Sequence, residues 1–234
     1  MKKFILLLII LISTEYSFSQ SVLMEQDVKK DSILPKFGKN YKNYYHFFVG
    51  LGAIIGQPDS AGSNIKYGFS NNINFGYRYK LRLCNLYSIG FEIAYNNYAF
   101  NLKQDSSKVL PNKLLHDKEK LTFNNIGLGI YNRFNFGKRG NRIGNYLDIG
   151  AYGDWICGVK HFMKDEQSNG NIIKTTISHL KYYETFAYGV SASIGFNWFA
   201  LTAKYRISDM FVKSYNYPEL PRLTVGIQLG LLTK

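Results

Sequence analysis

The sequence predicts an all-β protein, an eight-stranded antiparallel up-and-down transmembrane β-barrel with short periplasmic turns and longer outer loops. Three observations predict this fold. Apolar and polar residues alternate with period two through most of residues 44–232, as in strands with two unlike faces. Short and long connections alternate along the chain, and one face of the strands consists largely of Gly and Ser. An aromatic fraction of 16%, with 21 Gly and only 5 Pro, also favours strands over helices.

Residues 1–19 have the features of a secretory signal peptide. Two lysines precede an apolar run over residues 4–12, and small residues occupy the two positions that signal peptidase reads. The run is too short for a membrane-spanning helix, which needs about 20 residues. We predict that the mature chain begins at Gln20, with a disordered periplasmic leader over residues 20–43 and the barrel domain over residues 44–234.

The first three strands are predicted over residues 44–55, 67–83 and 87–100. In each of them, aromatic and aliphatic side chains occupy every second position. The segment INFGYRYKLRL, residues 73–83, alternates most regularly. One of its faces is an apolar wall, and the other carries three cations, Arg78, Lys80 and Arg82.

The fourth and fifth strands are predicted over residues 121–136 and 145–156. The phase of the alternation slips near Asn124-Asn125, which indicates a β-bulge. The turn between these strands is short, so Arg133 and Asp148 should lie at similar heights on neighbouring strands.

The last three strands are predicted over residues 182–196, 198–208 and 222–232. The turns are then short at one end of the barrel and long at the other, as in outer-membrane barrels. Cys84 and Cys157 fall at opposite ends, so we expect no disulfide between them. The short connections are 84–86, 137–144 and 196–197, and the long ones are 56–66, 101–120, 157–181 and 209–221.

The facing of the strands follows from the composition of their second face. A soluble barrel has the same period with its apolar face inside, so alternation alone does not decide. A face of Gly and Ser fits the crowded lumen of a narrow barrel, and the apolar face is then free to meet lipid. Aromatic residues near the strand ends are expected to form two interfacial girdles. Those at the turn end are Tyr44, Tyr45, Tyr87, Phe136, Phe196 and Trp198, and those at the loop end are Tyr95, Tyr98, Phe100, Trp155, Tyr182, Tyr183 and Phe211.

Charged residues at inward positions are expected to pair, because an unpaired buried charge is costly. We interpret them as a structural plug rather than a conducting or catalytic site, since so narrow a barrel is filled by its own side chains. His46 is expected to fill the lumen beside them. The predicted lumen network comprises Arg78, Lys80, Arg82, Glu92, Arg133, Asp148, Asp154, Lys204 and Arg206.

The chain is strongly basic, with a formal charge of +13 at pH 7. Removal of Lys2, Lys3 and Glu15 with the signal peptide leaves 27 basic and 15 acidic residues, a charge of +12. Basic charge favours an anionic partner. For an exported protein we expect outer-membrane lipid, lipopolysaccharide or another envelope component, and no nucleic acid.

The pattern of strands and turns resembles the PorT-like outer-membrane β-barrel family, which is similar in architecture to small OmpA- and OmpX-type barrels. The segment YGVSASIGFNWFALTAKYRISDMF, residues 188–211, carries the resemblance, with a Gly-rich strand, a tight aromatic turn and a second strand. The resemblance implies an outer-membrane location and a role as an accessory of protein secretion. The chain ends in Thr233 and Lys234, whereas many such barrels end on an aromatic residue read by the insertion machinery.

We expect a non-enzymatic protein without a cofactor, with a structural or binding role through its outer loops. A porin is disfavoured by the narrow interior. An outer-membrane hydrolase or acyltransferase is the alternative from another class, because loop histidines near carboxylates could supply a base or a metal ligand. The residues for such a site are His116 with Asp117, and His161 with Asp165 and His179. No phosphate-binding Gly loop, paired-Cys metal site or nucleotide fingerprint accompanies them.

Overall fold

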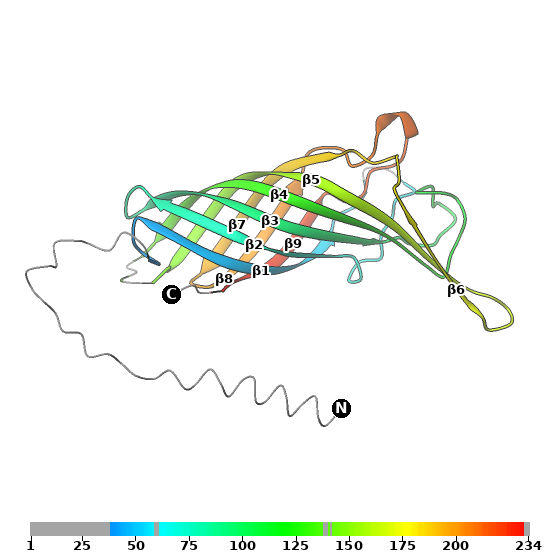
Figure 1. Ribbon diagram of the computed structural model, residues 1–234, viewed down its shortest axis with the longest axis horizontal. Helices are drawn as coiled ribbons and strands as arrows, with labels where there is room; N and C mark the ends of the chain where they lie inside the picture. The colour runs from blue at the N-terminus through cyan, green and yellow to red at the C-terminus, as the bar shows by residue number, and fades with distance from the viewer. Residues whose placement is uncertain (1–37, 59–60, 138–139, 141, 232–234) are drawn as a thin grey trace, which may run out of the picture. The chain divides into compact units, whose positions relative to one another are not determined.

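The computed structural model describes residues 38–58, 61–137, 140 and 142–231 (Figure 1). The predicted signal peptide and the predicted leader up to residue 37 lie outside these residues. No helix in the described ranges is long and apolar enough to cross a membrane. The elements are β1 Asn43–Ile55, β2 Asn71–Arg82, β3 Tyr87–Asn101, β4 Lys118–Phe136, β5 Asn145–Glu166, β6 Ile172–Ser178, β7 Phe186–Phe196, β8 Phe199–Arg206, the short 3-10 helix η2 Lys213–Tyr215 and β9 Leu223–Leu231.

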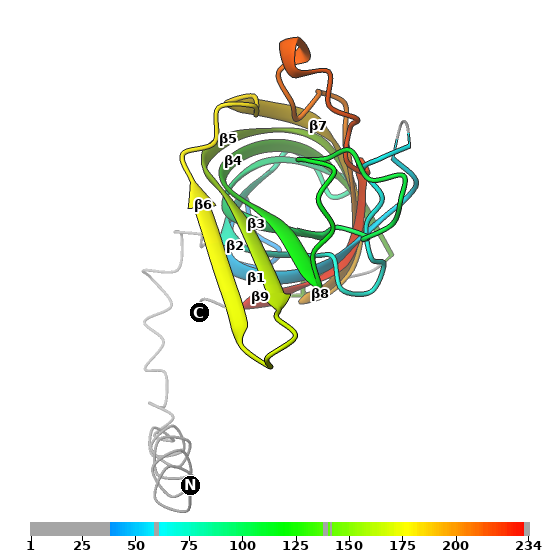
Figure 2. The same ribbon diagram turned by 90° about the vertical axis from the view of Figure 1, so that its right-hand side faces the viewer.

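Eight of these strands form one closed antiparallel ring, which Figure 2 shows from the end where the long connections lie. Each ring strand pairs with the next along the chain, and β9 pairs with β1, where Ile227 lies opposite Leu51. The predicted eight-stranded up-and-down barrel is therefore confirmed. Closure satisfies the backbone hydrogen bonds of every ring strand, which the bilayer core cannot do.

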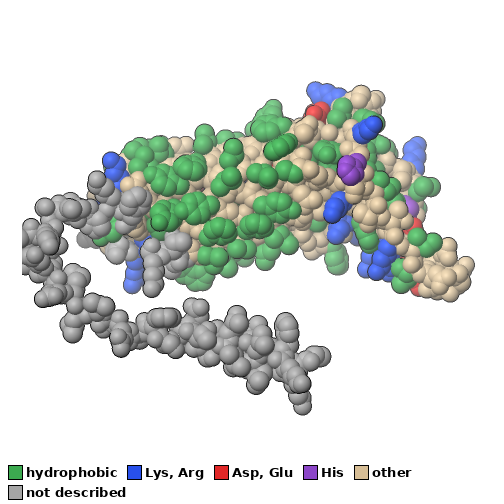
Figure 3. Space-filling view, viewed as in Figure 1, with side chains coloured by type: hydrophobic (Ala, Val, Ile, Leu, Met, Phe, Trp, Pro, Cys, Tyr) green, Lys and Arg blue, Asp and Glu red, His purple; other side chains and the backbone are tan. Residues whose placement is uncertain are grey.

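The outward face of the ring is apolar and exposed. Leu128 and Ile130 of β4, for example, are 63% and 69% exposed, whereas their inward neighbours Gly127, Gly129 and Tyr131 are buried. On the face that Figure 3 shows, apolar side chains cover the barrel wall as an apolar band, and Lys and Arg lie toward its two ends. So large an apolar surface is unsuited to water and matches the hydrocarbon layer of a membrane.

The segment 157–181, predicted as a long loop, instead contains regular structure. β5 continues to Glu166, and β6 returns along it as a hairpin that projects beyond the ring (Figures 1 and 2). The β-branched sequence of β6, IIKTTIS, favours a strand. The loop end of the barrel, where the long connections lie, therefore carries a three-stranded extension made of β4, β5 and β6.

The predicted irregularity at Asn124-Asn125 is present, but the extra residue lies on the partner strand. Asn124 pairs with Gly158 and Asn125 pairs with Ile156, so Cys157 of β5 is bulged out. β4 keeps its phase throughout. Cys84 and Cys157 are both free and exposed, as their predicted positions at opposite ends required.

Four of the aromatic residues predicted for the girdles point into the barrel instead. Tyr44, Tyr98, Phe100 and Phe211 are only 2–7% exposed. Tyr98, Phe100 and Phe211 pack in an apolar cluster with loop residues at the loop end, where burial of apolar surface is favourable. Tyr44 packs with Ile143, Tyr146 and Ala200 at the turn end. The prediction that these four residues contact the membrane interface was therefore wrong.

Candidate functional site

Four charged side chains from four consecutive strands meet in the interior, and we call them the charged cluster. Arg133 of β4 donates Nε and Nη2 to the two carboxylate oxygens of Asp148 on β5, at 2.7 and 2.8 Å. Arg78 of β2 donates Nη1 to Asp148 at 3.1 Å and Nε to Glu92 of β3 at 2.7 Å. The four residues are 1–8% exposed. Two cations and two carboxylates balance, as the burial of charge requires.

Two tyrosine rings complete the surroundings of the charged cluster. The ring of Tyr131 lies 4.7 Å from Cζ of Arg78, and the ring of Tyr146 lies 3.6 Å from Cζ of Arg133. A guanidinium on an aromatic face is stabilised where water is excluded. A Cβ on Gly195 would lie 1.9 Å from Cζ of Tyr146. The small inward residues noted in the sequence therefore make room for these rings.

Lys80 and Arg82 lie apart from the charged cluster, toward the turn end. Lys80 is 1% exposed, and its Nζ donates to the carbonyl oxygen of Lys39 at 2.7 Å. Arg82 is half-buried, and its Nη1 donates to Oδ1 of Asn40 at 3.2 Å. The segment 38–42, the last part of the predicted leader before β1, is thus hydrogen-bonded to the barrel.

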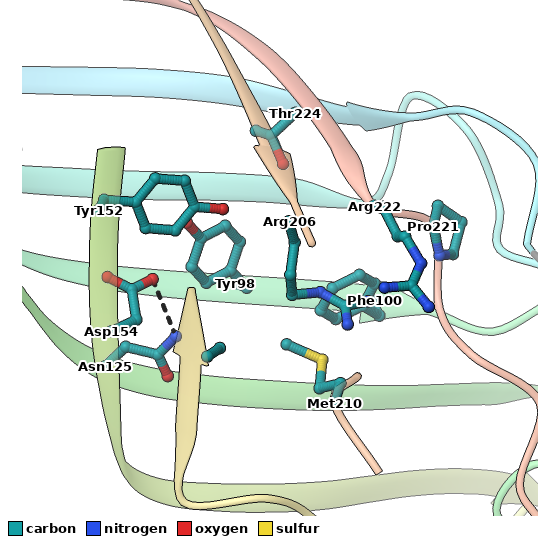
Figure 4. Close-up of a pocket in the computed structure, with 11 residues that line it drawn as sticks. Tyr98, Phe100, Asn125, Tyr152, Asp154, Arg206, Met210, Pro221, Arg222 and Thr224 are labelled. Carbon is teal, nitrogen blue, oxygen red and sulfur yellow. Dashed lines mark hydrogen bonds between the residues drawn. The ribbon is translucent and has the colours of Figure 1, made fainter. Parts of the chain in front are cut away.

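Lys204 and Asp154 flank the charged cluster. Nζ of Lys204 lies 3.8 Å from a carboxylate oxygen of Glu92. Asp154 is bound by amides, since Asn96 donates Nδ2 to it at 3.1 Å. Asn125 donates Nδ2 to it at 3.4 Å (Figure 4). Sequence reasoning missed these asparagines because it searched the inward positions for charges alone.

Arg206 is held by the loop between β8 and β9. Its guanidinium donates to the carbonyl oxygens of Ser208 and Leu220, and to the carboxylate of Glu219 at 2.9 Å. Glu219 also accepts from backbone amides of the same loop. This acid was missed because it lies outside the strands, where no periodicity indicates which way a side chain points.

The cavities beside these groups are small. One of about 20 Å³ lies next to Asp154 and Arg206, among Tyr98, Tyr152 and Met210 (Figure 4). Another of about 10 Å³ lies at the turn end. Such volumes are close to the minimum that holds one water molecule, so these spaces suit water and not a solute.

An apolar core fills the barrel at its loop end, and we call it the outer core. Phe123 and Leu121 of β4 are fully buried there, and Phe100 lies edge-on to Phe123 at 5.7 Å. The connecting loops contribute Leu110 and Leu220, which are also fully buried. The loops are therefore anchored inside the barrel mouth. The complete set is Ile54, Ile65, Tyr98, Phe100, Leu102, Leu110, Leu121, Phe123, Ile156, Val159, Ala187, Met210, Phe211 and Leu220.

A buried carboxylate joins the β3–β4 loop to β5 beside the outer core. Glu119, on the extension of β4 beyond the apolar band, accepts from Nζ of Lys108 and lies 2.7 Å from Nε2 of His161. Nε2 of Gln104 donates to it at 2.8 Å. Burial alone would raise the pKa of Glu119, but the hydrogen bonds from His161, Lys108 and Gln104 outweigh it and hold the pKa below its usual value. The cluster therefore favours a charged Glu119.

The histidines considered for catalysis are paired differently from the expectation. His116 contacts Asp165, at 2.8 Å from Nδ1, and not Asp117. His161 binds Glu119 instead of Asp165, and His179 is exposed with a positive φ of 59°. Within the described ranges, no group of three or more His, Cys, Asp and Glu residues is placed to hold a metal ion. His116 therefore joins the β3–β4 loop to β5, and His161 joins β5 to β4.

The hairpin of β5 and β6 leaves one strand edge open. β6 pairs with residues 160–166 of β5, and no other described strand pairs with it. All seven of its residues are exposed, and Ile172, Ile173 and Ile177 are 44–52% exposed. An exposed apolar edge is a surface on which another strand can pair.

Comparison with known proteins assigns the chain to a family. The family model described as outer membrane protein beta-barrel domain matches residues 18–208. This range contains seven of the eight ring strands, and β9, which closes the ring, lies beyond it. No curated protein sequence matches the chain. The matched range, together with the closed ring and its apolar outward face, shows that this chain is an integral outer-membrane protein of the outer membrane protein β-barrel domain family.

Proposed function

We propose that this protein is a closed, non-enzymatic barrel that binds a protein partner of the cell envelope through its outer loops. The open edge of β6 carries the proposal. An extended segment of a partner can add to this edge through backbone hydrogen bonds, and the exposed isoleucines provide apolar contact. Loops on a rigid scaffold commonly carry binding, and the outer core ties these loops to the barrel wall.

Site-specific photo-crosslinking in intact cells tests this proposal. A photoreactive residue at Thr175 of β6 is expected to capture one discrete envelope protein, whereas the same residue at Leu86, on a turn at the other end, is not. The double substitution Ile173→Ser and Ile177→Ser should abolish capture without unfolding the barrel, because both side chains are exposed. Identical capture at Thr175 and Leu86, or capture unaffected by the double substitution, would overturn the proposal.

A component of protein secretion is the partner class that the PorT-like resemblance of residues 188–211 supports. The edge of β6 would then be the surface through which the barrel joins such a machinery. Secretion of a reporter protein from cells that carry the double substitution, compared with wild-type cells, tests this version. Unchanged secretion, with the crosslink at Thr175 lost, would assign the partner to another process.

The two rival functions have less support. Among the described residues, no Ser or Cys is hydrogen-bonded to the ring of His116 or His161, so neither ring activates a nucleophile in this arrangement. Esterase or protease turnover that is abolished by His161→Ala would support the hypothesis that the protein is a hydrolase. The charged cluster and the outer core fill the interior and argue against a conducting pore. Sustained conductance in a planar bilayer would support the pore hypothesis.

A further inference from the structure

The outward face of the three-stranded extension carries five lysines, which we call the lysine face. Lys118 and Lys120 lie on β4, Lys160 and Lys164 on β5, and Lys174 on β6. On β4 and β5 they alternate with buried Glu119, Leu121, His161 and Met163, so they project to the opposite, outward side.

Three of these lysines lie directly opposite one another. Lys164 of β5 pairs with Lys118 of β4 on one side and with Lys174 of β6 on the other. Neighbouring strands are about 4.8 Å apart, so the row places three ammonium groups across about 10 Å. Like charges directly opposite each other destabilise a sheet unless a counter-charge accompanies them.

The protein supplies little counter-charge on this face. Glu119 and Asp165 lie on the other face, where they bind His161 and His116. The exposed Glu166 at the end of β5 shares the lysine face, opposite Ile172. None of the five lysines forms an ion pair with a described residue. The row therefore presents positive charge that an external anion can neutralise.

The height of the lysine face indicates which anion it meets. Farther down the same outward surface, Ile126, Leu128 and Trp155 are 43–63% exposed and belong to the apolar band. Lys120 is six residues beyond Ile126 along β4, which is about 20 Å along a strand and about 15 Å above the band for a strand tilted by about 40°. This is the layer of lipid headgroups and sugars, above the acyl chains.

We propose that the lysine face binds the phosphorylated saccharide of lipopolysaccharide in the outer leaflet. Ammonium groups act as point charges for phosphate, and five of them on one flat face fit several phosphates rather than a single small ion. Hydroxyl groups of neighbouring outward residues, Thr122, Thr176 and Ser178, can hydrogen-bond sugar hydroxyls. The proposal concerns this face and its lipid, and it does not depend on a protein partner at the β6 edge.

Lipid binding by the purified full-length barrel tests the inference. The probe is lipopolysaccharide that retains its phosphorylated inner core, titrated against barrel in detergent, and the test variant is Lys118→Gln, Lys164→Gln and Lys174→Gln together. An anionic lipid surface attracts each lysine enough that affinity should fall by about a hundredfold. The matched control removes the same charge from exposed lysines in other loops, Lys103→Gln, Lys113→Gln and Lys213→Gln.

The outcomes distinguish a specific binding site from non-specific electrostatic attraction. Loss of affinity in the test variant alone, with about fivefold of it recovered by Lys164→Arg in place of Lys164→Gln and the other two substitutions kept, supports the lysine face. Equal losses in test and control variants would show non-specific attraction and overturn the inference, as would no loss in either. Full competition by millimolar inorganic phosphate would overturn the lipid as ligand and assign the face to free phosphate.

Discussion

Replacement of Asp148 by Asn should strongly destabilise the barrel. The substitution keeps the size of the side chain but removes the charge that accepts three hydrogen bonds, two from Arg133 and one from Arg78. Arg78 keeps Glu92 as a partner, so the uncompensated charge falls mainly on Arg133, which is 1% exposed. Removal of one partner from a buried ion pair costs about 3–5 kcal/mol. We expect a loss of unfolding free energy in that range.

A double substitution distinguishes the loss of the ion pair itself from the cost of leaving Arg133 buried without a counter-charge. Arg133→Met with Asp148→Leu removes both charges and leaves Arg78 with Glu92, and it should recover most of the lost stability, since apolar replacement of a whole buried pair is often neutral. Urea unfolding and refolding in lipid vesicles, followed by tryptophan fluorescence, measures all variants. A loss below about 1 kcal/mol for Asp148→Asn would contradict our account, because this is the range of exposed pairs.

Three further outcomes are expected. Ile227→Arg places a cation on the lipid face and should cost about 2–4 kcal/mol in the same titration, so an unchanged stability would show that the facing is wrong. Phe123→Ala should cost about 3–5 kcal/mol if the outer core packs as described, and a negligible cost would mean that the core is loose. The lowered pKa of Glu119 stabilises the loop over residues 102–117 above the unfolded-state pKa of about 4.3, and this contribution is lost as the pH falls through the folded-state pKa. Hydrogen exchange of that loop should therefore rise in acid, whereas Glu119→Gln should show fast exchange with little dependence on this pH range.

The ring could be predicted because strand geometry imposes period two whatever solvent surrounds the sheet. The direction in which the apolar face points could be predicted because the opposite face consists largely of Gly and Ser, which suit a crowded lumen. The pairing of Arg133 with Asp148 followed from the same regularity, since residues equally distant from a short turn lie opposite each other. The other contacts of the lumen network could not be predicted, because they depend on the direction and length of each side chain. Lys80 and Arg82 have the inward period, but their partners belong to residues 38–42, whose conformation no pattern indicated.

The structure at the loop end was harder to predict because its interior changes from polar to apolar. Phe123 occupies an inward position. Because it is apolar like the outward residues, the sequence pattern looks shifted by one residue there, although the strand itself is not shifted. The bulge at Cys157 does shift the phase of β5, so the alternation beyond it seemed to end. The sequence therefore predicts a loop where the hairpin lies, and the five lysines of the lysine face fall in the two predicted loops 101–120 and 157–181.

The strands that supply the charged cluster are also consecutive in synthesis. β2, β3, β4 and β5 each contribute one of its four members, and each is the neighbour of the next in the ring. The opposite charges therefore cancel wherever these four neighbouring strands are paired, and this does not require the β1–β9 pairing that closes the cylinder. A sheet of β2 to β5 alone would consequently avoid most of the free-energy cost of carrying isolated charges toward hydrocarbon.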